Sequence, residues 1–92
     1  MKAKAIIVMM EALVEDVTTV LGDTDEIVDI KLPEAVKEVL IKTIKSNMQP
    51  EEWGLFKNTK IDKIVSFLIR EGSYVFGDAQ QTEIFIISAK IL

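Results

Sequence analysis

Hydrophobic positions near the C-terminus change from a helical spacing to the composition of strands. Over residues 59–71 the apolar side chains recur at i, i+3, i+4 and i+7, which predicts a helix with one buried face: Ile61, Ile64, Val65 and Leu68. Gly72 follows at the position where a residue of left-handed conformation usually ends a helix. Residues 73–76 and 82–88 are rich in β-branched and aromatic side chains and flank a polar break, so they predict a hairpin.

A second helix is predicted over residues 33–48. Pro33 suits a first helical turn, and one side of the helix is apolar: Val36, Val39, Leu40, Ile44 and Met48. Residues 27–32 alternate between apolar and polar side chains and predict a short strand before it. Residues 22–26, Gly-Asp-Thr-Asp-Glu, have the composition of a turn.

Residues 5–21 fit two patterns. Seven apolar positions step by three or four toward Gly22, as in a helix that ends at a glycine: Ile6, Met10, Leu13, Val14, Val17, Val20 and Leu21. Five positions also alternate, as on one face of a strand: Ile6, Val8, Met10, Ala12 and Val14. The helix is favoured because the alternation stops at Val14, whereas the helical spacing continues to the glycine.

Together these segments predict a single α+β domain over residues 1–92. It would contain about three helices, one short strand and a C-terminal β-hairpin, in an order like that of winged-helix proteins.

Branched aliphatic residues are abundant for so short a chain, with 13 Ile and 9 Val against 7 Leu. A 92-residue fold has a large surface for its volume, so part of this apolar area is expected at an interface. The last strand is apolar on both faces, so it is either sandwiched inside the fold or pairs with another subunit, for which edge pairing across a two-fold axis is one solution. We therefore expect a homodimer or larger homo-oligomer, with these partner-binding candidates: Trp53, Phe56, Ile84, Phe85, Ile86 and Ile87.

The chain offers little for catalysis. It has no Cys and no His, which excludes thiol chemistry, cysteine-ligated zinc and the commonest general base. No nucleophile motif or phosphate-binding glycine loop is present. Asp23, Asp25, Asp29 and Glu34 have a spacing like that of a calcium loop, but Val28 replaces the required glycine. We expect no enzyme activity, no metal and no cofactor.

Three functions are compatible with these patterns. The leading hypothesis is a small interaction or regulatory protein that acts as a homo-oligomer. The second is a winged-helix transcriptional regulator that binds DNA through basic residues on and before the helix 59–71: Lys57, Lys60, Lys63 and Arg70. The third is an acidic inhibitor encoded by a mobile element, because residues 1–31 hold the whole net charge of −4.

The N-terminal apolar run, residues 5–10, is too short to span a bilayer or to act as an export signal. We therefore expect a cytoplasmic protein that does not enter a membrane.

Overall fold

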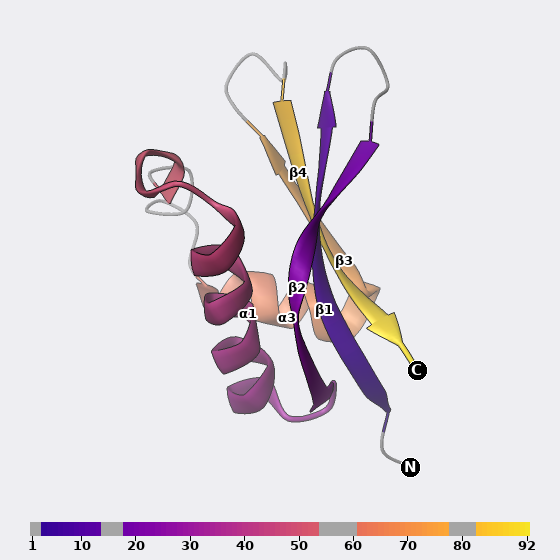
Figure 1. Cartoon of the computed structure of the whole chain (residues 1–92). Helices are drawn as coiled ribbons and strands as arrows, with labels where there is room; N and C mark the ends of the chain where they lie inside the picture. The colour runs from indigo at the N-terminus through magenta and orange to yellow at the C-terminus, as the bar shows by residue number, and fades with distance from the viewer. Residues whose placement is uncertain (1–2, 14–17, 54–60, 78–82) are drawn as a thin grey trace.

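The computed structural model describes residues 3–13, 18–53, 61–77 and 83–92 (Figure 1). The elements run in the order β1 (Lys4–Leu13), β2 (Thr18–Asp29), α1 (Pro33–Asn47), the 3-10 helix η1 (Pro50–Trp53), α3 (Ile61–Glu71), β3 (Ser73–Gly77) and β4 (Glu83–Ile91). The strands form one antiparallel sheet in the order β2-β1-β4-β3. Two hairpins therefore join through β1 and β4, the inner strands, while β2 and β3 form the edges.

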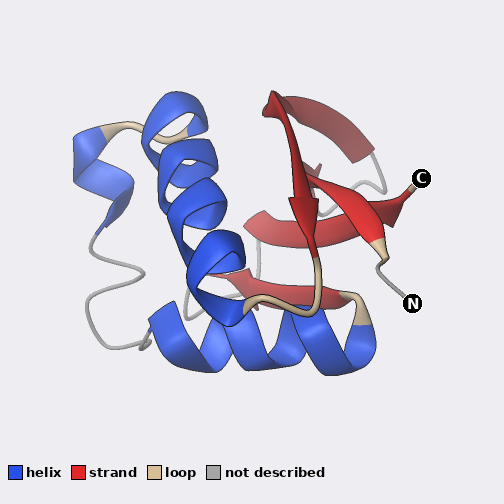
Figure 2. Cartoon of the chain, turned by 90° about the horizontal axis from the view of Figure 1, so that it is seen from below, coloured by secondary structure: helices blue, strands red, loops and turns tan. Residues whose placement is uncertain are grey.

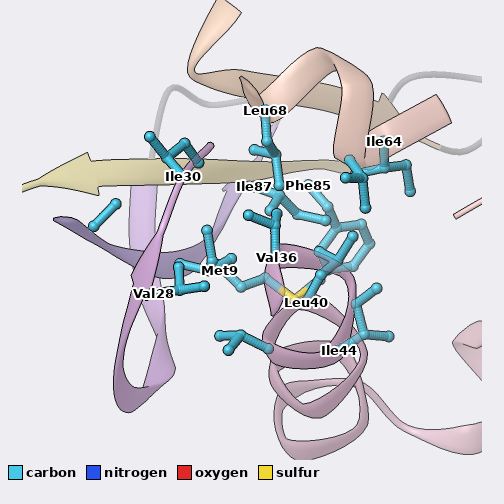
Figure 3. Close-up of a cluster of buried hydrophobic side chains, with 14 of the residues drawn as sticks. Met9, Val28, Ile30, Val36, Leu40, Ile44, Ile64, Leu68, Phe85 and Ile87 are labelled. Atoms are coloured by element: carbon cyan, nitrogen blue, oxygen red, sulfur yellow. The ribbon is translucent and has the colours of Figure 1, made fainter. Parts of the chain in front are cut away.

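Both α-helices cover the same face of the sheet (Figure 2). Helix α1 packs mainly on β2 and also on β1, and α3 packs on β3 and β4. The core lies between these two layers, and among the described residues its cluster of buried hydrophobic side chains is aliphatic except for Phe85, Met9 and Met48. Figure 3 shows side chains from both helices and three strands meeting there, among them Met9, Val36, Leu40, Ile64, Leu68 and Ile87.

The helix predicted over residues 33–48 is confirmed, as are the described parts of the helix predicted over 59–71 and of the C-terminal hairpin; residues 59–60 and 78–82 lie outside the described residues. Helix α1 begins at Pro33 and α3 ends at Glu71. Gly72 adopts a left-handed conformation with φ 84°, and its N–H donates to the Leu68 carbonyl at 3.0 Å. The Gly72 carbonyl then accepts from the Ala89 N–H at 2.8 Å, so one residue ends the helix and aligns β3 with β4.

The predicted N-terminal helix is wrong, because residues 4–13 form strand β1. Both faces of β1 are apolar. Ala5, Ile7 and Met9 are fully buried under the helices, while the alternate side chains point to the other face of the sheet. When both faces of a strand are apolar, nearly every position is apolar, so apolar residues can be found three or four positions apart as well as two apart. The helical spacing in residues 5–13 arises in this way.

The fold class is corrected accordingly. The described residues form two α-helices and a four-stranded antiparallel sheet, a small α+β fold, instead of about three helices with one short strand. The winged-helix-like order is also wrong, because the described chain begins with a β-hairpin that completes the sheet.

Residues 22–29 also differ from their prediction. The expected turn and the first part of the expected short strand lie inside one 12-residue strand, β2. Its pairing with β1 shifts twice, between Ile6 and Val8 and between Met9 and Met10. Residues that usually form turns form β-bulges here. Asp25 has φ 58°, and its N–H donates to Asp23 Oδ1 at 2.6 Å.

Gly22 sits in this bulged segment, where it does not cap a helix. Its φ of 151° disfavours other residues, and a Cβ there would lie 2.7 Å from Asn47 Oδ1. Glycine therefore lets the last turn of α1 approach β2 closely.

The strand ends at Asp29 and does not continue to Leu32 as predicted. The Asp29 carboxylate accepts from the Lys31 N–H at 3.0 Å, and its carbonyl accepts from the Leu32 N–H at 3.0 Å. These bonds close the turn that leads into α1.

Candidate interaction surface

Strand β4 divides the predicted partner-binding residues between two environments. Phe85 and Ile87 belong to the core, with 2% and 0% of their surface exposed. Ile84 and Ile86 point to the opposite face of the sheet and are half-buried. Phe56 lies outside the described residues, as does the side chain of Trp53 at the end of η1.

Of the two explanations that the sequence leaves open for β4, enclosure within the sheet is the one observed, and edge pairing with another subunit is wrong. The strand is hydrogen-bonded to β1 on one side and to β3 on the other, so it has no free edge. Strand β4 is apolar on both faces for a different reason. One face packs in the core, and the other is part of a second apolar surface.

That second surface is the open face of the sheet, the side opposite α1 and α3. The strand register places nine apolar residues on it: Ile6, Val8, Met10, Ala12, Val20, Ile27, Val75, Ile84 and Ile86. Val20, Ile27 and Val75 expose 63%, 60% and 57% of their surface. One face of an antiparallel sheet is commonly solvated, but such a face normally carries polar side chains. This uncovered face is mostly apolar, although the register also places Asp23, Ser88 and Lys90 on it, and an exposed apolar area of this kind is a candidate interaction site.

A shallow hollow of about 460 Å³ lies on the open face across β2, β1 and β4. Aliphatic side chains form most of its lining, including Ile6, Val8 and Met10. Asp23 from the bulged part of β2 and Lys90 from β4 are its charged members. The hollow thus combines an apolar floor with one acidic and one basic group.

Of the apolar residues on the open face, Ile84 and Ile86 are among those expected from the sequence to bind a partner, and the other seven are not. Ile6, Val8 and Met10 do carry a signal in the sequence, because they alternate as one face of a strand does. Val20 and Val75 carried no local signal, because only pairing with β1 and β4 brings them to this face.

The basic residues proposed for DNA binding do not form a uniform surface. Lys63 and Arg70 are exposed on α3, while Lys57 and Lys60 lie outside the described residues. Arg70 Nε lies 3.2 Å from Glu71 Oε1, and its guanidinium carbon lies 4.9 Å from the centre of the Phe67 ring. Without a winged-helix fold, the geometric reason for placing α3 in a major groove is lost.

The acidic N-terminal segment is partly neutralised by α1. Lys42 Nζ lies 3.2 Å from Glu26 Oε1 on β2 and 3.5 Å from Glu38 Oε1. Within the described part of the chain, no three acidic side chains come close enough to hold a metal ion. Asp23 and Asp25 do interact, and a side-chain hydrogen bond and charge repulsion from Asp23 raise the pKa of Asp25 above its usual 3.8.

This pair predicts a pH-dependent stability. Because the pKa of Asp25 is raised in the folded state, the folded protein binds more protons than the unfolded chain just above pH 3.8, and stability falls as pH rises through that window. Asp25→Asn removes the repulsion and tolerates the positive φ. We expect the variant to be more stable than the wild type at pH 7 in urea unfolding, with the difference shrinking toward pH 3. A difference independent of pH would contradict this account.

Comparisons with known proteins give no assignment: no family model, curated protein or solved structure matches the chain. Neither helix in the described ranges is long and apolar enough to cross a membrane.

Proposed function

We propose that this protein is a non-enzymatic interaction protein that acts as a homodimer, with the open faces of two sheets packed against each other. The observation that supports the proposal most directly is the apolar open face itself. Both described helices lie on the other side of the sheet, and no described element covers Val8, Ile86 or their neighbours. Packing two sheets face to face is a common way to bury such surfaces.

The size of the open face suits a dimer. With about 3.3 Å per residue along a strand and about 4.8 Å between strands, it measures on the order of 600 Å² in projection. Side-chain relief adds to this area, and specific dimers bury about 800 Å² per partner. The face therefore approaches the area that a specific two-fold contact buries on each partner.

The charges favour a second copy of the chain over a strongly charged partner. The hollow contains Asp23 and Lys90, one group of each sign, within an aliphatic surface. A face with charges of only one sign would repel its own copy, whereas a face with one of each does not. A polyanion such as DNA would meet mainly aliphatic side chains here, which offer no phosphate contacts.

Sedimentation equilibrium of the purified protein tests the proposal. We expect a dimer at micromolar concentration, with little dependence on salt because apolar burial dominates the contact. A monomer throughout the micromolar range would overturn the proposal.

A further inference from the structure

The two edges of the sheet differ in how they are protected. Edge strand β2 has two register shifts, a glycine and the charged residues Asp23 and Asp25, which are features that prevent another strand from pairing. Edge strand β3, Ser73–Gly77, pairs with β4 in continuous register and contains no charged residue or proline. Of the two edge strands in the described sheet, β3 is therefore the one with a regular edge to which a strand can add.

The register shows which backbone groups of β3 are free to pair. Since Ala89 donates to the Gly72 carbonyl, Ser73 and Ser88 form a non-hydrogen-bonded pair. Hydrogen-bonded and non-hydrogen-bonded pairs alternate along an antiparallel ladder, so the backbone N–H and C=O groups of Tyr74 and Phe76 bond to β4. The N–H and C=O groups of Ser73, Val75 and Gly77 point away from β4, and no other described strand pairs with them.

A groove of about 450 Å³ runs beside this edge between β3 and α3. Lys63, Phe67 and Glu71 line it from one side of the helix, since they recur every four residues. Phe67 and Tyr74 contact each other edge-to-face with ring centres 5.2 Å apart, and both rings line the groove. An edge strand beside a helix, with an apolar groove between them, is the arrangement in which extended peptides bind as an added strand.

The charges around the groove favour an acidic partner segment. Arg70 and Glu71 pair with each other, so they largely cancel. Lys63 makes no ion pair with any described residue and lies at the groove. A carboxylate on a bound segment would form an ion pair with the Lys63 ammonium group.

We propose that β3 binds an extended segment of another polypeptide as a fifth strand of the sheet. Side chains of the bound segment point alternately to the two faces of the sheet. The apolar ones enter the groove over Phe67 and Tyr74, and an Asp or Glu lies near Lys63. This site goes beyond the proposed dimer. It uses the outward backbone groups of β3 and the groove beside α3, and Val75 contributes its backbone to this site and its side chain to the open face.

Selection from a phage-displayed library of random dodecapeptides on the full-length protein tests this site. We expect the enriched peptides to alternate apolar and polar residues and to carry at least one acidic residue. On addition of an enriched peptide, NMR signals of the amides of Ser73, Val75 and Gly77 should shift and exchange more slowly with solvent. Enrichment of sequences without these features, no enrichment, or shifts confined to other strands would overturn the proposal.

Two variants separate backbone pairing from charge. Val75→Pro removes an outward N–H without breaking a bond to β4, and we expect about tenfold weaker peptide binding. Val75→Thr keeps the N–H and the β-branched shape, so it should bind as the wild type does. Lys63→Glu lies on the surface of α3 and should weaken binding about fivefold. Undiminished affinity in Lys63→Glu and Val75→Pro would also refute the site.

The same selection on the Ile86→Lys variant distinguishes the two proposals. If the dimer forms as proposed, this variant is a monomer but keeps the groove, and it should retain peptide binding. Loss of the dimer with retained binding separates the two surfaces, whereas loss of binding in a folded Ile86→Lys monomer would show that the peptide needs the dimer contact and would overturn the β3 site.

Discussion

Ile86→Lys is expected to convert the dimer into a folded monomer. Ile86 lies on the open face of an inner strand, beside Met10 on β1 and Val75 on β3. A lysine there would have to lose its hydration in a mostly apolar contact, which costs several kcal/mol. We expect the dissociation constant of the dimer to rise at least about 100-fold. Sedimentation equilibrium measures this change, and circular dichroism should show an unchanged fold.

The matched control for Ile86→Lys is Ile69→Lys. Ile69 is on α3 with 37% of its surface exposed, outside the core. The same substitution there adds the same charge and should leave the dimer intact. An Ile86→Lys protein that stays dimeric would place the subunit contact elsewhere on the molecule.

Leu40→Ala is expected to lower the free energy of unfolding by about 2–5 kcal/mol. Leu40 is fully buried on the face of α1 that meets the sheet, and Figure 3 shows it among the side chains of the core. Truncation removes apolar contacts and leaves a cavity, because a packed core relaxes only in part. Urea unfolding should be followed at one fixed protein concentration, since dimer formation also contributes to the apparent stability.

Leu32→Ala controls for the chemical change itself. Leu32 precedes α1 and exposes 54% of its surface, so removing the same atoms should cost less than about 1 kcal/mol. If Leu40→Ala and Leu32→Ala lowered the free energy of unfolding equally, the core between the helices and the sheet would not be the main source of stability.

The parts of the fold that could be predicted are those with local causes. Pro33 and the 3.6-residue spacing after it identify α1, because both act within a few turns of one helix. Gly72 marks the end of α3 through its own backbone conformation. The hairpin of β3 and β4 joins neighbours in sequence, so its composition and polar break were sufficient to recognise it.

The N-terminal third could not be predicted in the same way. In β1 the apolar series Ile6, Val8 and Met10 is interleaved with a second apolar series on the other face, so the alternation of apolar and polar side chains that identifies a half-buried strand is missing. The polar residues from Gly22 to Glu26 resemble a turn, but here they form bulges within β2. Both errors arise because pairing partners far away in the chain determine what these residues do.

The candidate surfaces show the same division. The amino-acid sequence alone determined that this chain has more branched aliphatic side chains than a small core can hold, since composition and length suffice for that inference. Only the tertiary structure decided where the branched aliphatic side chains that do not fit into the core lie. Placing β4 between β1 and β3 sends Phe85 and Ile87 into the core and leaves Ile84 and Ile86 on the open face. The physical reason is that the exposure of a strand's two faces depends on its neighbours in the sheet and on the helices that cover it, and long-range packing sets both.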